Sequence, residues 1–253
     1  MSVPQAAGTR RERRLAERAA RHDARRRPQR GRSFSLGWLT ALALLAGAIV
    51  VAIAILFGSP PAGPVADAGS VTRARVPAGL SMDGLALGRA DAPVTIDLYE
   101  DFQCPACESW SRNVFPKLAS NELASGSVRI VFHDMAFLGQ ESVDAGRAAY
   151  AALQQGRFWD MWATLYANQG RENSGAFSRD RLIAMAGQLG LDITRFEADM
   201  DSGSARAAIE ESRAGAGRAG ISSTPTLVID GQAFAGVLPY TEIADAIAAA
   251  SGR

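Results

Sequence analysis

Two cysteines stand three residues apart in the stretch YEDFQCPACESW, residues 99–110, and they are the two cysteines of a 253-residue chain. A C-x-x-C spacing suits three kinds of chemistry: a thiol–disulfide couple, half of a metal site, or a pair of small buried side chains. Spacing does not choose among them. The choice depends on the compartment and on the elements that hold Cys104 and Cys107.

The charge of the chain is divided unevenly. Its net charge is +1, but residues 1–33 contain eleven arginines against Glu12, Glu17 and Asp23, a net of +8. The remainder is therefore net negative, and its overall composition, 47% hydrophobic and 21% charged, is that of a globular protein. We interpret the basic arm as a determinant of membrane topology and expect no nucleic acid to bind it.

Residues 34–57, FSLGWLTALALLAGAIVVAIAILF, form a run of 24 residues without a charge. As a helix this run would be about 36 Å long, enough to cross a hydrocarbon core of about 30 Å. A cleaved signal peptide has a shorter apolar run, about 7–15 residues. The run predicts a single uncleaved transmembrane anchor, and the basic arm predicts that residues 1–33 stay in the cytoplasm while the cysteines lie outside it.

Residues 58–88 are rich in Gly, Pro and Ala, which predicts a flexible linker that separates the anchor from one domain, residues 89–253. In that domain β-branched and aromatic residues predict strands at 93–100, 128–134 and 224–230, followed by a short strand at 232–236. Helices are predicted at 105–124 and 240–250, and a helical insertion at about 139–218. The order of elements predicts an α/β domain with an inserted helical subdomain.

A structural zinc ion at the cysteines would need more ligands than the chain supplies on one side of the membrane. A structural zinc site takes four, and besides Cys104 and Cys107 the chain has only His22 and His133 as imidazole ligands, with His22 in the cytoplasmic arm. Glu108 follows Cys107, so the C-x-x-C-H signature of haem attachment is absent. Cu(I) accepts two or three soft ligands, so a copper-binding thiol module with Cys104, Cys107 and His133 remains an alternative.

Redox chemistry suits the position of the pair. Cys104 follows a predicted strand and Pro105 fits the first turn of a helix, where its missing N–H has no partner to lose. The free N–H groups and the positive end of that helix favour a thiolate at Cys104. Cys107, one turn later, is predicted to be more buried. We therefore expect Cys104 to attack and Cys107 to resolve.

Three segments in this order, DFQCPAC, GRAAYAALQQGRFWDMWATLY and GISSTPTLVIDGQAFAG, resemble the DsbA family of extracytoplasmic thiol:disulfide oxidoreductases over roughly residues 85–250. The resemblance implies a thioredoxin-like fold with a helical insertion. It also implies that the Thr224–Pro225 bond is cis, lies beside the cysteines and receives an extended substrate segment. No metal or cofactor is expected in the protein.

Two departures from the family concern acidity. Pro-Ala separates the cysteines where the best-known members have histidine as the second residue, so we expect Cys104 to be less acidic and its disulfide less oxidising than theirs. Leu98 occupies the position of the buried carboxylate found in many thioredoxin-like proteins. Asp97, Glu100 and Asp101 are the candidate replacements as proton relay, although we expect these side chains to be exposed.

The sequence thus predicts a membrane-anchored dithiol oxidase that forms disulfides in exported proteins, with the catalytic domain outside the cell membrane. Its substrates would be exported protein thiols. With no further cysteine or cofactor, the reduced enzyme needs an electron acceptor, and the resemblance implies a quinone-linked membrane oxidase. A disulfide reductase or isomerase is the alternative, because the direction depends on reduction potential and partner.

Overall fold

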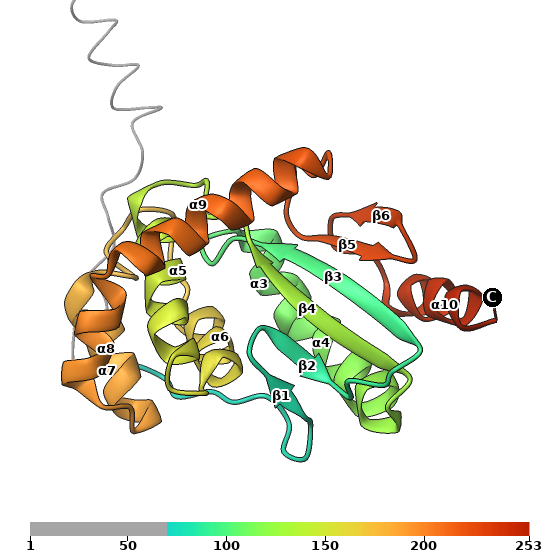
Figure 1. The fold of residues 1–253 in the computed structure, drawn as a ribbon, viewed down its shortest axis with the longest axis horizontal. Helices are drawn as coiled ribbons and strands as arrows, with labels where there is room; N and C mark the ends of the chain where they lie inside the picture. The colour runs from blue at the N-terminus through green and yellow to red at the C-terminus, as the bar shows by residue number, and fades with distance from the viewer. Residues whose placement is uncertain (1–69, 253) are drawn as a thin grey trace, which may run out of the picture. The chain divides into compact units, whose positions relative to one another are not determined.

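The computed structural model describes residues 70–252, and in them six strands form one sheet in the order β1-β2-β4-β3-β5-β6 (Figure 1). The two central strands, β3 and β4, run parallel, and every other neighbouring pair is antiparallel. The strands are β1 Met82–Asp83, β2 Ala86–Gly88, β3 Val94–Glu100, β4 Val128–Asp134, β5 Thr226–Ile229 and β6 Gln232–Ala235.

The connection between β3 and β4 is helical, but it is not the single helix that the sequence predicted over 105–124. It consists of α3 Pro105–Asn113, α4 Phe115–Leu118 and a π-helical turn, Ala119–Leu123. Pro116 explains the break, because proline has no N–H for the carbonyl four residues earlier and its ring clashes with that carbonyl. Trp110 and Leu118 are fully buried, so both pieces still contribute to the hydrophobic core.

The predicted helical insertion is confirmed. Between β4 and β5 lie α5 Gln140–Leu153, α6 Phe158–Ala167, α7 Arg179–Leu189, α8 Ile193–Met200 and α9 Gly203–Arg218. Its apolar stripe is core, as the helical spacing predicted, since Trp159, Trp162, Leu165, Leu182, Met185 and Phe196 are all buried. The chain ends in α10 Tyr240–Ser251, which packs against α4, β3 and β5.

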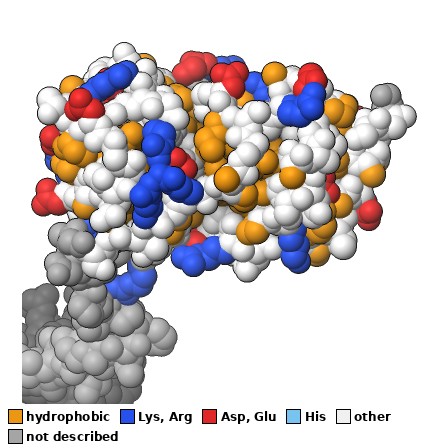
Figure 2. Space-filling model, turned by 90° about the horizontal axis from the view of Figure 1, so that it is seen from below, with side chains coloured by type: hydrophobic (Ala, Val, Ile, Leu, Met, Phe, Trp, Pro, Cys, Tyr) orange, Lys and Arg blue, Asp and Glu red, His pale blue; other side chains and the backbone are white. Residues whose placement is uncertain are grey.

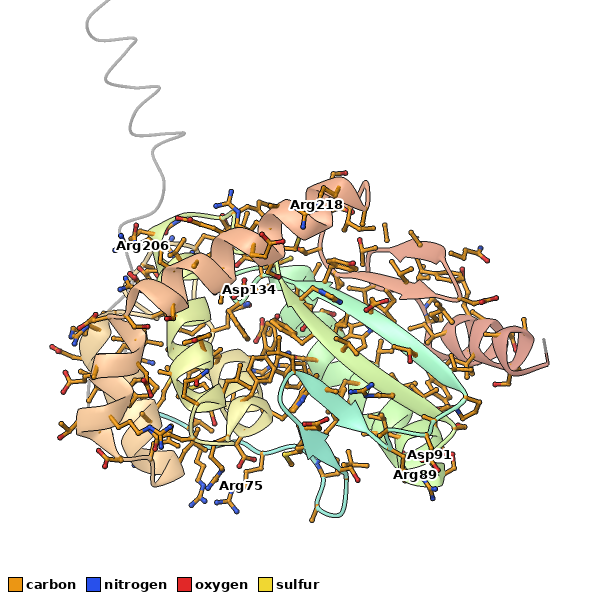
Figure 3. All side chains as sticks on the ribbon, viewed as in Figure 1. Arg75, Arg89, Asp91, Asp134, Arg206 and Arg218 are labelled. Carbon is orange, nitrogen blue, oxygen red and sulfur yellow. The ribbon has the colours of Figure 1, made fainter. Side chains whose placement is uncertain are left out.

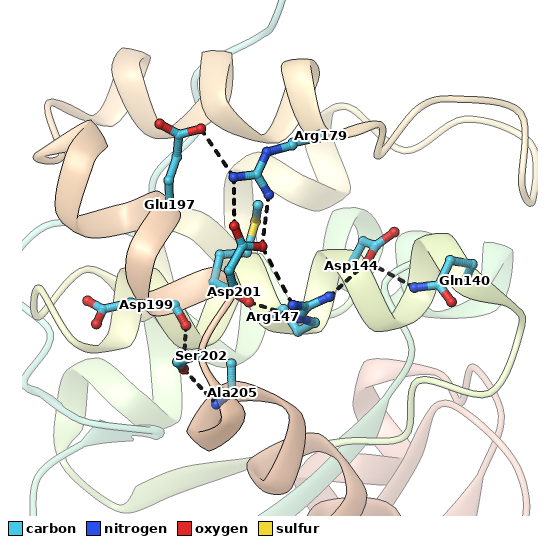
Figure 4. Close-up of polar contacts among 10 residues, drawn as sticks. Gln140, Asp144, Arg147, Arg179, Glu197, Asp199, Asp201, Ser202 and Ala205 are labelled. Atoms are coloured by element: carbon cyan, nitrogen blue, oxygen red, sulfur yellow. Dashed lines mark hydrogen bonds and ion pairs between the residues drawn. The ribbon is translucent and has the colours of Figure 1, made fainter.

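Ion pairs on the surface join the helices of the insertion. Arg179 at the start of α7 donates two hydrogen bonds of 2.9 Å to Asp201 and one of 3.2 Å to Glu197 (Figure 4). Arg147 of α5 lies 3.6 Å from Asp201 and donates to the Met200 carbonyl. These contacts connect α5 and α7 to the turn between α8 and α9.

The predicted flexible linker, 58–88, extends too far toward the domain. Residues 82–88 form β1 and β2, and β2 pairs with β4 in the sheet. A Cβ at Gly88 would lie 2.6 Å from the Val128 carbonyl oxygen, and Gly88 has a φ of +107°, so this strand needs glycine. Gly-rich composition therefore signalled close backbone contact here, and the folded domain begins before residue 89.

The side of the domain that carries β1 has a mixed surface. Figure 2, seen from below relative to Figure 1, shows basic and acidic side chains scattered between patches of hydrophobic ones. Apolar atoms normally make up much of a protein surface, so scattered patches of this kind do not call for a partner.

The membrane anchor predicted for residues 34–57 lies outside the described residues, as does the basic arm. Among residues 70–252 no helix has the length and apolar character needed to cross a bilayer.

Candidate active site

Cys104 caps the N-terminus of α3, directly beyond the end of β3. Its backbone is extended, with φ −70° and ψ 118°, and Pro105 occupies the first turn of the helix as predicted. A tight turn connects strand to helix, because the Cys104 N–H donates to the Asp101 carbonyl at 3.0 Å. The thiol therefore lies at the carboxyl edge of the sheet, where free N–H groups of the helix meet it.

The two thiols differ in accessibility. Both cysteines are reduced; Cys104 retains 7% exposure and Cys107 none. This order confirms the prediction that the residue one turn into the helix is the more buried. The Cys104 Sγ donates to the carbonyl oxygen of Thr224 at 3.4 Å, across 120 positions of sequence.

The acidities of the two thiols diverge as well. A hydrogen bond from the Cys107 thiol lowers the pKa of Cys104 to about 6 although burial opposes it, and the side chain of Thr224 and the backbone N–H groups of Cys107 and Ala106 contribute less. Burial, the hydrogen bond to Cys104 and the carboxyl of Glu100 raise the pKa of Cys107 far above its usual value. These shifts favour the thiolate form at Cys104 and the thiol form at Cys107.

The loop before β5 forms the other side of the site. Its Thr224–Pro225 peptide bond is cis, as the resemblance implied, and Pro225 is buried. The sheet brings this loop to the cysteines, since Tyr99 of β3 pairs with Thr226 of β5. Within residues 70–252 the backbone N–H groups of Ser222, Ser223 and Thr224 donate no hydrogen bond, so they are free for another chain.

Glu100 is fully buried, contrary to the expectation that it is exposed. Its Oε2 accepts a hydrogen bond of 2.8 Å from the Trp162 indole, and its Oε1 has no hydrogen-bond partner among the described residues. Burial raises the pKa of Glu100 to about 8. The alternation of side chains along β3 could have predicted this burial, because Glu100 shares the inner face of the strand with Ile96 and Leu98, both fully buried.

Asp101 is also fully buried, again contrary to expectation, but its surroundings are different. One carboxylate oxygen accepts from the Gln103 N–H and the Ser142 hydroxyl, both at 2.7 Å. The other accepts from the N–H groups of Phe137 and Leu138 at 2.8 and 3.0 Å. Four donors make Asp101 a structural anchor for the loops around the cysteines.

A third buried carboxyl, Asp134, ends β4 beneath α9 (Figure 3). It accepts a hydrogen bond of 2.9 Å from the Ala136 N–H. Burial, reinforced by the charge of Asp101, raises the pKa of Asp134 to about 8. Sequence reasoning missed this group, because Asp134 stands at the end of a strand where polar residues are usually exposed.

His133 and Asp97 lie on the other face of the sheet from the cysteines. His133 Nε2 lies 2.8 Å from Asp97 Oδ1, and its ring stacks on Tyr99 with centroids 4.4 Å apart. The structure therefore does not bring His133 to the thiols as a third copper ligand. Residues 70–252 contain no group of three or more His, Cys, Asp or Glu side chains placed to hold a metal ion.

The sequence matches the thioredoxin family over residues 81–249, which includes the strands, the CPAC helix and the cis-proline loop. The chain belongs to the thioredoxin family. This thioredoxin domain begins at β1, in agreement with the sheet and not with the predicted boundary at residue 89.

Several known proteins resemble this chain. A probable disulfide bond formation protein D from Bacillus cereus is 27% identical over 150 residues, covering 57% of this chain and 69% of that protein. The structure of oxidised BdbD from Bacillus subtilis shares the fold, with a TM-score of 0.63 and 22% identity over 73% of this chain and all of that one. A part of the Na(+)/H(+) antiporter NhaA from Herminiimonas arsenicoxydans is 31% identical over 149 residues, covering 59% of this chain and 22% of the antiporter. The family match and these relatives support the predicted resemblance to DsbA-like thiol:disulfide oxidoreductases.

Proposed function

We propose that this oxidoreductase is a dithiol oxidase that uses Cys104 and Cys107 to form disulfides in exported proteins. One observation carries the proposal. Cys104, which keeps 7% exposure and whose pKa is lowered to about 6, stands one helical turn from the fully buried Cys107, whose pKa is raised, beside a cis-proline loop. The relative named as a disulfide bond formation protein supports the direction of the reaction.

The reaction begins with Cys104 and Cys107 joined as a disulfide. A substrate thiolate attacks Cys104 Sγ, the Cys104–Cys107 bond breaks, and a mixed disulfide forms while Cys107 leaves as a thiolate. A second substrate thiolate then attacks the substrate sulfur of the mixed disulfide. Substrate disulfide leaves, and the enzyme retains two electrons as reduced Cys104 and Cys107. The low pKa makes Cys104 a good leaving group in this last step.

Cys107 must gain a proton when it leaves and lose it when the enzyme is reoxidised. Glu100 is the group we assign to this transfer. It is buried beside the pair, its pKa of about 8 lets it hold or release a proton near neutral pH, and Oε1 is unoccupied by any described donor. The indole of Trp162 fixes the other oxygen and thereby orients the carboxyl.

Thr224 and Pro225 are assigned to substrate binding. Because the N–H groups of residues 222–224 donate no hydrogen bond within the described chain, an extended substrate segment can pair with them as an added strand. This pairing places the substrate cysteine opposite Thr224, whose carbonyl contacts the Cys104 thiol.

The location we propose is extracytoplasmic, with residues 34–57 as a single anchor and residues 1–33 in the cytoplasm. The uncharged run of 24 residues and the +8 arm support this topology. Exported protein thiols are then the substrates. The electrons pass to a quinone-linked membrane oxidase, since the chain has no third cysteine to accept them.

Trapping of mixed disulfides tests the assigned roles. The Cys107→Ala variant keeps the attacking thiol of Cys104 but cannot resolve a mixed disulfide by an intramolecular step. Mixed disulfides with exported proteins should therefore accumulate in this variant, and Cys104→Ala should give none. Equal trapping by both variants would refute the assignment of attacker and resolver. The redox state of Cys104 and Cys107 in living cells tests the direction of the reaction. A pair that is mostly a disulfide supports the oxidase, whereas a pair that is mostly a dithiol would indicate a reductase or isomerase instead.

A further inference from the structure

A cavity of about 230 Å³ lies where the helical insertion meets the sheet. Strand β4 and the residue before β2 form one side of it, and α5, α6 and α9 form the others. Neither cysteine lines this cavity, and neither does the loop before Pro225. It is therefore a separate place in the molecule, with no part in the disulfide chemistry described above.

The cavity has an apolar floor and an open rim. In the floor, Phe132, Ala149, Phe158 and Ile209 are each at most 5% exposed. At the rim, Leu85 is 38% exposed. An apolar cavity of about 150 Å³ is enough to hold benzene. This cavity therefore has room for one aromatic ring with a short substituent, and its rim is open to solvent.

The carboxyl of Asp134 stands in this apolar floor, beneath α9 (Figure 3). Asp134 is only 7% exposed. Its Oδ1 accepts a hydrogen bond of 2.9 Å from the Ala136 N–H, whereas its Oδ2 has no hydrogen-bond donor within residues 70–252. No basic side chain of those residues forms an ion pair with Asp134. The cavity thus contains a buried acceptor oxygen that lacks a donor.

The helix beside this carboxyl leaves space for it. Gly146 lies in the interior of α5, where glycine is unfavourable because it loses more conformational freedom on folding than any other residue. A Cβ at position 146 would collide with Asp134 Oδ2 and would lie 2.8 Å from Ile209 Cδ1. Glycine at this position therefore lowers the stability of the helix but keeps the unpaired oxygen accessible from the cavity.

The charges around Asp134 favour a cation over an anion. Burial, followed by the charge of Asp101, raises the pKa of Asp134, and the charge of Arg213 on α9 only partly opposes this. A carboxyl in such surroundings is stabilised in its ionised form when a ligand brings a positive charge to it. Aromatic side chains add to this preference, because Phe132, Phe158 and Tyr150 line the cavity and aromatic rings attract cations.

We propose that this cavity binds a small organic ammonium, an amine that carries an apolar group about the size of one aromatic ring. The ammonium donates a hydrogen bond to Asp134 Oδ2 and balances its charge. The apolar group covers the floor and is removed from water. Neither thiol takes part, so this binding is independent of the dithiol oxidase reaction.

Isothermal titration calorimetry of the full chain with phenethylamine tests the proposal. The titration is made at about pH 9, where Asp134 is ionised and an alkylammonium is still largely charged. Phenylethanol, which is neutral, and phenylacetate, which is an anion, are the matched ligands. We expect phenethylamine to bind at least about tenfold more tightly than phenylethanol, the gain of one charge-assisted hydrogen bond, and phenylacetate not to bind.

Two variants test the assigned residues. Asp134→Asn keeps the size of the side chain and can still accept from the Ala136 N–H, but it carries no charge. It should weaken phenethylamine at least about tenfold and leave phenylethanol unchanged. Ala208→Leu fills the cavity and should abolish binding of both ligands, whereas Ala207→Leu, at the adjacent and exposed position of α9, should preserve it. Circular dichroism verifies that each variant is folded.

The possible outcomes decide between occupants of the cavity. Equal affinities for phenethylamine and phenylethanol, or equal affinities of the wild-type chain and Asp134→Asn for phenethylamine, would overturn the ammonium. Butylamine resembles a lysine side chain, and its binding as tightly as phenethylamine would assign the cavity to a lysine of another protein instead. A folded chain that binds no probe at millimolar concentration would overturn the site. None of these results bears on the trapping of mixed disulfides at Cys104, so this proposal and the oxidase proposal fail separately.

Discussion

The charged groups around the cysteines and those on the helical insertion are held in opposite ways. On the insertion, Arg179, Glu197 and Asp201 pair with one another at the surface, and the side chains of Arg179 and Asp201 remain 45% and 53% exposed (Figure 4). At the site, Glu100 and Asp101 are fully buried, and neither forms an ion pair with another residue of 70–252. Water and opposite charge make the first arrangement inexpensive in free energy, whereas the second depends entirely on hydrogen bonds.

Within the site, the neighbouring carboxyls of Asp101 and Glu100 also differ in how many hydrogen bonds they accept. Asp101 accepts four hydrogen bonds, whereas Glu100 accepts one and keeps a bare oxygen. A carboxyl with all its lone pairs occupied holds structure, and one with a bare oxygen and a raised pKa can exchange a proton. A buried carboxyl is therefore a candidate for proton transfer when its hydrogen bonding is incomplete, and burial alone does not identify it.

The largest effect is expected at Asp101. Asp101→Ala leaves the N–H groups of Gln103, Phe137 and Leu138 and the Ser142 hydroxyl without their acceptor, so we expect a loss of at least about 3 kcal/mol in the free energy of unfolding. Urea denaturation measures it. Asp97→Ala is the matched control, because Asp97 is 40% exposed and contacts only His133, and it should cost less than about 1 kcal/mol. Similar losses in both variants would break the distinction between anchored and exposed carboxylates.

Glu100→Gln tests the proton transfer. Glutamine keeps the size of the side chain and can still accept from Trp162, but it cannot exchange a proton, so we expect reoxidation of the Cys104–Cys107 pair to slow about 10²-fold and to lose its pH dependence near pH 8. Stopped-flow kinetics from pH 6 to 9 measure both. Glu108→Gln, next to Cys107 in sequence but paired with Arg112, should leave the rate unchanged. An unaltered rate in Glu100→Gln would remove Glu100 from the mechanism.

A smaller effect concerns stability and pH. Burial raises the pKa values of Glu100 and Asp134 to about 8, above their unfolded values near 4, so the folded state favours the protonated forms. With respect to these groups the free energy of unfolding is then greatest below about pH 4, and it falls as the pH rises toward 8. Urea titrations at pH 5 and pH 8 should show a shallower fall in Asp134→Asn. Asp83→Asn, at a side chain 86% exposed, should show the wild-type slope.

The smallest effect is expected on the insertion. Arg179→Ala breaks contacts to Asp201 and Glu197, yet both partners can be hydrated, so the free energy of unfolding should fall by less than about 1 kcal/mol, and by less still in high salt. Arg147→Ala should cost more, because its side chain is only 17% exposed and donates to the Met200 carbonyl. Thermal unfolding of both variants at two salt concentrations measures the difference. A larger, salt-independent loss at Arg179 would contradict the contrast between the two regions.

Much of the fold could be predicted because it follows from local pattern. The β-branched runs located β3 and β4, the turn at Asp230-Gly231 separated β5 from β6, and helical spacing bounded the insertion within a few residues. The boundary of the linker was predicted wrongly because the same composition can indicate two different structures. Glycine signals a flexible tether or a crowded strand, and only the pairing of Gly88 with β4 distinguishes them.

The sequence by itself determined the pair of thiols and their order of burial, because Cys104, Pro105 and Cys107 lie within one helical turn and their geometry follows from the backbone of that turn. It did not determine which carboxyl lies beside them, nor that the loop before Pro225 lies against the Cys104 thiol. Those relations join residues as much as 120 positions apart, and they depend on how the sheet and the insertion pack. Desolvation is the physical reason: a carboxyl changes its pKa only when neighbours from distant parts of the chain exclude water from it, and only the tertiary structure assembles those neighbours.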